Sequence, residues 1–131
     1  MNNSKIRYMV IDDEPIAHRI IEDYCNALPH LLLVNHSHDA LEAMQFLATN
    51  TVDIIFLDLN MPVMDGIEFT RPIKKYPSCK FVPLVMLSSE QDEDKISEAR
   101  KVGISTFLSK PLNEKQLKKL RLLRRKTVSY R

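Results

Sequence analysis

Five polar side chains stand where apolar runs of the sequence end, and their types could do chemistry together. They are Asp12, Asp13, Asp58, Ser88 and Lys110. Carboxylates bind hard cations such as Mg²⁺ through oxygen, and a carboxylate can also attack phosphorus to give an aspartyl phosphate. A metal ion and an ammonium group would then offset the charge of a phosphoryl group in transfer. Whether these side chains lie close together depends on the strands and helices that carry them.

Short apolar runs alternate along the chain with segments of helical spacing. The runs predict strands at residues 6–11, 31–34, 54–57, 84–87 and 104–108. Apolar residues recur at helical spacing in the segments between them, which is typical of amphipathic helices. Strands that are apolar throughout and separated by helices indicate a parallel sheet covered on both faces. The predicted fold class is therefore α/β, a doubly wound five-stranded parallel sheet with five helices.

Prolines and one glycine affect the expected element bounds. Pro83 cannot donate a ladder hydrogen bond, so the fourth strand is placed at Leu84–Leu87. Pro72 falls inside the helix expected over residues 67–76 and should restrict it or shift its start. The fourth helix is expected over residues 89–102, with Gly103 as its C-terminal stop.

Topology brings the five polar residues together. In open parallel sheets, ligand sites lie at the carboxyl ends of the strands, so these side chains should surround one crevice. Three carboxylates there disfavour one another's ionisation, and Mg²⁺ would offset their charge. Asp58 directly follows the apolar run Ile54–Leu57, where burying a charged side chain that has no function would cost folding free energy. The sequence therefore predicts a metal site at this edge.

Composition excludes several classes of protein. The 131 residues predict one domain, and 2 glycines cannot form either common glycine-rich phosphate loop. Cys25 and Cys79 form no CxxC motif, which favours reduced thiols and a cytoplasmic location. No apolar run approaches the roughly 18 residues that a membrane span needs, and no signal peptide is recognisable.

The net charge of +2 is unevenly distributed. Eight of the 19 Lys and Arg residues follow Glu114, and no acidic residue does. The basic segment 115–131 is either the solvated face of the last helix or an interaction strip for an acidic partner or nucleic acid. We favour the solvated face, because no aromatic residue is interleaved in the basic run 121–126.

Histidines offer a weaker metal signal. His36 and His38 form an HxH pair, but no third ligand is nearby in the sequence. We therefore expect both to be solvated residues at a strand end. His18 is expected on the surface of the first helix.

Four motifs, in order, carry a resemblance to a known family. They are V-I-D-D-E-P (10–15), F-L-D-L-N-M-P-V-M-D-G (56–66), M-L-S-S-E (86–90) and F-L-S-K-P (107–111). Together they resemble the receiver domain of two-component response regulators over about residues 5–125. The N-terminal half is also similar to receivers of LytR/AlgR-type transcription regulators. The resemblance implies a flavodoxin-like fold with strand order 2-1-3-4-5, and a single receiver domain over residues 1–131.

The resemblance implies a role for each matching residue. Asp58 would be the phospho-acceptor. The Mg²⁺ ligands would be the carboxylates of Asp12, Asp13 and Asp58 and the backbone carbonyl of Asn60.

Four further residues match the family's phosphoryl-binding and switch positions. Lys110 would pair with the phosphoryl group, and its peptide bond to Pro111 would be cis. Ser88 would hydrogen-bond a phosphoryl oxygen, and Phe107 would swing inward when that hydroxyl moves.

The expected function is a phosphoryl-accepting signalling switch rather than an enzyme, with only self-phosphorylation and autodephosphorylation. Its partners would be a sensor histidine kinase or phosphotransfer protein, and an output partner or effector domain. A homodimer could form through the surface of the fourth helix, fifth strand and fifth helix. No membrane partner is expected, nor nucleic acid for this chain alone.

Two alternatives stay open. The chain could be the receiver fragment of a DNA-binding transcription regulator. It could also be an aspartyl-nucleophile phosphohydrolase, although Asn60 stands where the haloacid-dehalogenase class has an acidic residue.

Overall fold

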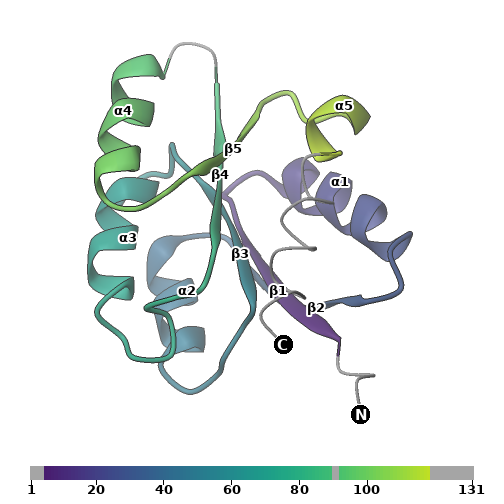
Figure 1. Ribbon diagram of the computed structural model, residues 1–131, viewed down its shortest axis with the longest axis horizontal. Helices are drawn as coiled ribbons and strands as arrows, with labels where there is room; N and C mark the ends of the chain where they lie inside the picture. The colour runs from purple at the N-terminus through teal and green to yellow at the C-terminus, as the bar shows by residue number, and fades with distance from the viewer. Residues whose placement is uncertain (1–4, 90–91, 119–131) are drawn as a thin grey trace.

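Strands and helices alternate in the computed structural model, which describes residues 5–89 and 92–118. The elements are β1 (Ile6–Ile11), α1 (Pro15–Asn26), β2 (Leu31–Ser37), α2 (Ala40–Leu47), β3 (Ile54–Asp58), α3 (Gly66–Ile73), β4 (Leu84–Ser88), α4 (Glu93–Lys101), β5 (Thr106–Ser109) and α5 (Glu114–Leu117). All strand pairs are parallel, in the order β2-β1-β3-β4-β5 (Figure 1). The predicted α/β class and flavodoxin-like strand order are confirmed.

Helices cover both faces of the sheet. Residues of α2, α3 and α4 join one buried cluster, whereas α1 and α5 join the other, and Figure 1 shows the two groups on opposite sides. Side chains alternate along a strand, so Met9 and Ile11 belong to the first cluster and Tyr8 and Val10 to the second. β3 and β4 are buried along their whole length. The strand ends at the site are therefore anchored in the core.

Proline acts differently in α3 and β4. α3 begins at Gly66 because Asp65 and Glu68 form a capping box there, so Pro72 does not shift its start. Pro72 instead occupies the last turn, and the helix ends at Ile73. β4 begins just after Pro83, as predicted, and the Pro83 carbonyl accepts a hydrogen bond from the Ile55 amide.

The predicted first residues of α4 and β5 are wrong. α4 begins at Glu93 rather than at Ser89, because Ser89 and Asp92 bond to each other in the loop before the helix. Gly103 does follow the end of α4, with the positive φ of 104° that glycine tolerates. β5 covers Thr106–Ser109 rather than residues 104–108.

The last helix is described only at its start. Asn113 caps α5, since its Oδ1 accepts from the Gln116 amide at 3.0 Å. The predictions for residues 119–131, including most of the basic segment, lie outside the described residues. In the part of the chain that is described, no helix has the length and apolar character to cross a membrane.

β2 is longer than predicted and changes register midway. It pairs Tyr8 with Leu33 but Met9 with Asn35, so one extra residue is inserted. This shift pairs His36 with Val10, whose side chain belongs to the face that α1 covers. A register change of one residue moves a side chain to the other face of a sheet. His36 therefore points toward α1.

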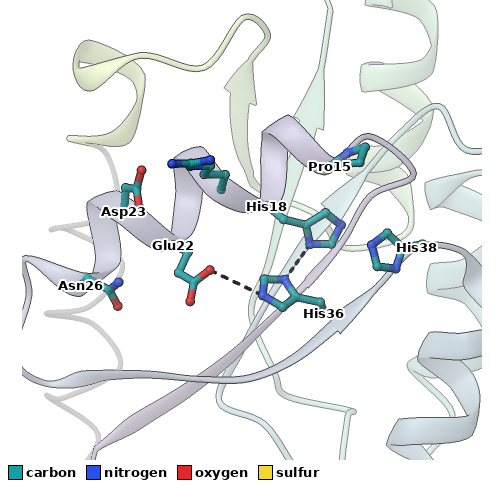
Figure 2. A pocket seen from close by; sticks show the side chains of 8 residues that line it. Pro15, His18, Glu22, Asp23, Asn26, His36 and His38 are labelled. Atoms are coloured by element: carbon teal, nitrogen blue, oxygen red, sulfur yellow. Dashed lines mark hydrogen bonds and ion pairs between the residues drawn. The ribbon is translucent and has the colours of Figure 1, made fainter.

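His18 is buried, only 5% exposed, which corrects the expectation that it lies on the surface. Its Nε2 donates to the main-chain carbonyl of Asp12 at 2.7 Å, and its Nδ1 lies 2.9 Å from Nδ1 of His36 (Figure 2). Burial lowers the pKa of His18 below the usual value. His36 and His38 are exposed as expected, but they adjoin this buried ring rather than only solvent.

Candidate functional site

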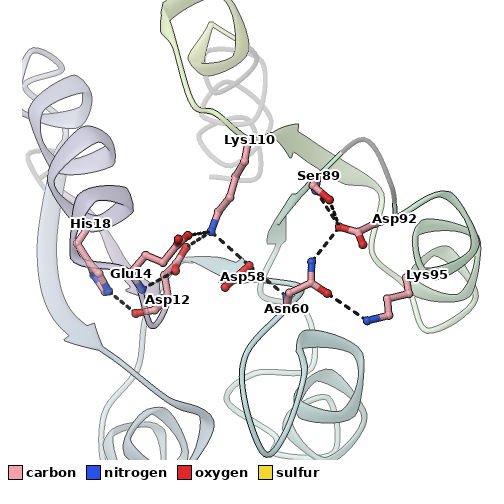
Figure 3. Close-up of polar contacts among 9 residues, drawn as sticks. All are labelled: Asp12, Glu14, His18, Asp58, Asn60, Ser89, Asp92, Lys95 and Lys110. Atoms are coloured by element: carbon pink, nitrogen blue, oxygen red, sulfur yellow. Dashed lines mark hydrogen bonds and ion pairs between the residues drawn. The ribbon is translucent and has the colours of Figure 1, made fainter.

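The predicted polar residues meet at the carboxyl edge of the sheet. Asp58 is the last residue of β3 and Ser88 the last of β4, and both are almost fully buried. Asp12 directly follows β1, where its amide donates to the Ser37 carbonyl, and it is completely buried. Figure 3 shows Asp12 and Asp58 side by side with Lys110 reaching toward both. The core strands thus hold these side chains at fixed positions.

Three carboxylates form a compact donor set. One oxygen from each of Asp12, Asp13 and Asp58 lies within 4.8 Å of the others, and Asp13 is exposed. Such a group of oxygen donors fits a hard divalent cation. Burial, and next the charge of Asp12, raise the pKa of Asp58 to about 7, which expresses the cost of gathering these charges.

Lys110 provides the cation in this cluster. Its Nζ lies 2.9 Å from Oδ2 of Asp12, 2.8 Å from Oε1 of Glu14 and 3.4 Å from Oδ1 of Asp58. Burial alone would lower the pKa of Lys110, but its bonds to Glu14 and Asp12 and the charge of Asp58 raise it above the usual value. Lys110 is therefore held charged between the carboxylates.

Sequence reasoning missed Glu14 as a site residue. Its carboxylate is 58% exposed and binds Lys110 from the solvent side. This bond and the charge of Lys110 lower the pKa of Glu14. The V-I-D-D-E-P motif contains Glu14, so its place beside two site carboxylates was the available signal.

A second missed group lies at the mouth of the site. Oδ2 of Asp92 accepts from the amide and hydroxyl of Ser89, each at 2.8 Å, and from the side-chain amide of Asn60 at 2.9 Å (Figure 3). Lys95 donates to the other end of the Asn60 side chain at 3.1 Å. Although burial would raise the pKa of Asp92, these hydrogen bonds lower it. The loop before α4 is thereby joined to the loop after β3.

Several of the residues at the carboxyl ends of the strands line one pocket. Its lining includes Asp13, Asp58, Asn60, Ser88 and Lys110. The Lys110–Pro111 peptide bond is cis. Phe107 is not part of this lining; it lies on β5, partly buried, with the Arg100 guanidinium 4.8 Å from its ring centroid.

The arrangement can do one kind of chemistry well. The pocket presents a carboxylate, a hydroxyl and an ammonium group to the same small space, beside further oxygen donors. An anionic group with transferable phosphorus would meet a nucleophile at Asp58 and positive charge at Lys110.

Comparison with known proteins agrees with this chemistry. Residues 8–121 match the model of the response regulator receiver domain. A cyclic di-GMP phosphodiesterase response regulator, RpfG of Xanthomonas campestris pv. campestris, is 28% identical, over 86% of this chain and 30% of that protein. The two-component response regulator ORR1 of Oryza sativa subsp. japonica is 29% identical, over 88% of this chain and 53% of that protein.

A solved structure gives the same picture. The chemotaxis response regulator CheY4 of Vibrio cholerae superposes with a TM-score of 0.80 and 28% identity, over 93% of this chain and 98% of that chain. The chain spans about a third to a half of the curated relatives named above. From the family match, the fold and the strand-end site, it follows that the chain belongs to the response regulator receiver domain family of two-component signalling.

Proposed function

We propose that Asp58 accepts a phosphoryl group and that the chain works as a phosphorylation switch. The observation that carries this proposal is the group of Asp12, Asp58 and Lys110, with Lys110 Nζ 2.9 Å and 3.4 Å from the two carboxylates. A buried aspartate at the end of a core strand, beside a fixed cation, is a positioned nucleophile. Nothing in the fold requires this concentration of charge.

The transfer would begin with the ionised carboxylate of Asp58. One of its oxygens forms the new P–O bond while the P–N bond to a donor phosphohistidine breaks, and the electron pair stays on the departing imidazole nitrogen. Lys110 offsets negative charge on the phosphoryl oxygens. The Ser88 hydroxyl, which lines the same pocket, would donate a hydrogen bond to one of them.

The carboxylate group fits Mg²⁺ as a cofactor, because three carboxylate oxygens lie within 4.8 Å of one another. Asp12, Asp13 and Asp58 would hold the ion together with the main-chain carbonyl of Asn60. Mg²⁺, when bound, supplies positive charge that favours the ionised form of Asp58 and offsets charge on the phosphoryl group.

The output would be a change of surface. When Ser88 bonds the phosphoryl group, Phe107 turns inward, and the surface of α4, β5 and α5 changes shape. A partner responds only if it binds the two states with different affinity. The donor would be a histidine kinase or phosphotransfer protein, and the receiver of the signal an effector domain or separate partner, all in the cytoplasm. A homodimer through the same surface is a further form of output.

The first test is covalent. Wild-type protein incubated with Mg²⁺ and a small phospho-donor should gain the mass of one phosphoryl group, measured on the intact chain. Asp58→Ala should gain none, whereas Asp94→Ala, a change of an exposed carboxylate on α4, should react like wild type. An unmodified wild type, or equal yield in Asp58→Ala, would refute the assignment.

A larger regulator is the second candidate. The transcriptional regulatory protein DegU of Brevibacillus brevis is 29% identical, and this chain spans 47% of it. By analogy, the chain would be the receiver part of a DNA-binding protein, of LytR/AlgR or another type. Sequencing the source gene beyond codon 131 tests this directly: a stop codon there would exclude it.

We do not propose an enzyme. A phosphohydrolase would need a general acid two residues after the nucleophile, and Asn60 cannot supply a proton in this way. Its side chain is also bound at both ends, to Asp92 and Lys95. Multiple turnovers on a phosphate ester would overturn this view.

A further inference from the structure

Asp92 joins the loop after β3 to the segment after β4 at the mouth of the site. Its Oδ2 accepts from the amide and the hydroxyl of Ser89, each at 2.8 Å, and from the side-chain amide of Asn60 at 2.9 Å (Figure 3). Ser89 directly follows β4, and Asn60 lies two residues after the end of β3. One carboxylate oxygen therefore holds both segments in place relative to α4.

Asn60 connects this contact to Asp58. Its main-chain amide donates to Oδ1 of Asp58 at 3.1 Å, while its side-chain Nδ2 donates to Asp92. Lys95 donates to Oδ1 of Asn60 at 3.1 Å, so the side chain of Asn60 is fixed at both ends. A single residue thus bonds to the carboxylate that would be phosphorylated and to the carboxylate at the mouth.

Ser89 belongs to the pocket in which Asp58 would be phosphorylated, because both residues line it together with Ser88 and Lys110. A phosphoryl group adds nearly two negative charges and three strong acceptor oxygens. An amide and a hydroxyl at the edge of the same pocket are donors that such oxygens attract. In the structure, both of these Ser89 donors already bind the carboxylate of Asp92.

We propose that Asp92 competes with the phosphoryl group for the two donors of Ser89, so that phosphorylation releases the contact between Asp92 and Ser89. The inference rests on the phosphorylation proposed for Asp58. The carboxylate of Asp92 also repels a second anion in the adjoining pocket. It therefore stabilises the unphosphorylated arrangement and disfavours the phosphorylated one. Asp92 acts as a regulatory residue that does not touch the reacting atoms.

A purely structural role for Asp92 makes a different prediction. The Asp92 amide donates to the Ser89 carbonyl at 3.2 Å, so the two residues form a reciprocal pair just before α4. If this pair only stabilised the start of the helix, removing the carboxylate would weaken anion binding in the pocket or leave it unchanged. Competition predicts the opposite sign, because removing the competitor makes an anion bind more tightly.

Binding of beryllium fluoride tests the competition, because this anion imitates a phosphoryl group on a carboxylate without a transfer step. The full chain is titrated with Mg²⁺ at saturation, and amide resonances report the affinity. Asp92→Ala should bind about fivefold more tightly than wild type, the factor expected for a hydrogen bond that water can replace. Asp92→Asn, which keeps an acceptor without the charge, should lie between the two. Asp94→Ala, a change of an exposed carboxylate in the first turn of α4, should keep the wild-type affinity.

A second measurement follows the contact itself. The scalar coupling across the hydrogen bond from the Ser89 ¹⁵N to the Asp92 carboxylate ¹³C should be present in the free wild type and absent once beryllium fluoride is bound. A role limited to helix stability would leave this coupling in place.

The outcomes separate this proposal from the function on which it rests. Equal or weaker binding in Asp92→Ala, or a coupling that persists in the bound wild type, would overturn the competition while leaving Asp58 as the acceptor. Failure of the wild type to bind beryllium fluoride, or equal binding by Asp58→Ala, would refute the acceptor role of Asp58 and the competition with it.

Discussion

Two polar clusters meet at Asp12, and they differ in charge and in origin. The side chain of Asp12 belongs with Asp58 and Lys110, whereas its main-chain carbonyl accepts from His18. The first cluster is built from the ends of neighbouring strands. The second is built from one face of α1 and the register of β2 against β1.

The two clusters differ in how much charge they bury, and buried charge affects both the reactivity of a site and the stability of the fold. Asp12 and Asp58 are buried with Lys110 as their cation, so every change of charge there alters both folding and reactivity. In the histidine cluster only His18 is buried, and burial lowers its pKa, whereas its partners His36 and His38 are exposed and can be changed at little cost to the fold. Perturbations of the two clusters should therefore differ in size and in what they affect.

The largest effect should follow Lys110→Ala. Phosphoryl uptake should fall about 10²–10³-fold, because the charge facing the phosphoryl oxygens is lost. Without metal, the free energy of unfolding should fall by about 3 kcal/mol at pH 8, since two buried carboxylates lose their cation. Intact-mass time courses and urea denaturation measure the two effects. Lys75→Ala, at an exposed lysine after α3, is the matched control. Wild-type stability in Lys110→Ala would show that the carboxylates are compensated in another way.

A pH dependence specific to the carboxylate cluster is the next effect. Burial and the charge of Asp12 raise the pKa of Asp58 to about 7 in the folded state, above its value in the unfolded chain. Between about pH 4 and pH 7 the unfolded chain releases a proton that the folded protein keeps, so stability falls as pH rises and then levels off. Without metal, Asp58→Asn should be more stable than wild type at pH 8, by up to about 4 kcal/mol, and equal to it at pH 4.

Chemical denaturation at a series of pH values, in EDTA, provides the measurement. Adding Mg²⁺ should reduce the difference, because a bound cation favours the ionised Asp58. A constant difference between the variants from pH 4 to pH 8 would contradict the raised pKa. The same series on His36→Gln should show no corresponding gain at pH 8.

The carboxylate cluster could be predicted because one rule of topology determines it. Parallel strands end at the same edge of a sheet, so any residue that follows an apolar run can be placed there. Asp12, Asp58, Ser88 and Lys110 all satisfied this rule. Strand order and the separate roles of these residues came instead from the resemblance to receiver domains.

The histidine cluster could not be predicted, because it depends on a local irregularity. His36 faces α1 only because β2 carries one extra residue between its pairings with Tyr8 and Met9. No feature of the sequence around Val34 marks this insertion. The position of Asp92 likewise depends on the loop before α4, which moved the start of that helix from the expected Ser89 to Glu93.

A smaller effect should come from Gly66→Ala, which should disturb the carboxylate cluster but not the histidine cluster. A Cβ at Gly66 would lie 2.7 Å from the main-chain oxygen of Asp58 and 3.0 Å from Cα of Leu59, so the backbone under the acceptor must move. We expect a loss of about 1–2 kcal/mol in stability and slower phosphoryl uptake.

Gly103→Ala is the control for Gly66→Ala, because it should strain the backbone away from the carboxylate cluster. Its φ of 104° disfavours alanine, but an added Cβ would meet no atom within 4 Å. It should therefore lose comparable stability and keep wild-type phosphoryl uptake. Equal uptake in the two glycine variants, measured by intact mass, would separate the backbone at Gly66 from the reactivity of Asp58.

The smallest effect should follow Asp92→Ala, at the exposed mouth of the site. The change removes the acceptor of the Ser89 amide and hydroxyl and of the Asn60 side chain. Because water can replace these bonds, the loss of stability should be only about 1 kcal/mol. Amide exchange at Ser89 should nevertheless accelerate, whereas Asp94→Ala in the first turn of α4 should leave it unchanged. An effect as large as that of Lys110→Ala would mean that the contacts at the mouth, rather than buried charge, determine the energetics of the carboxylate cluster.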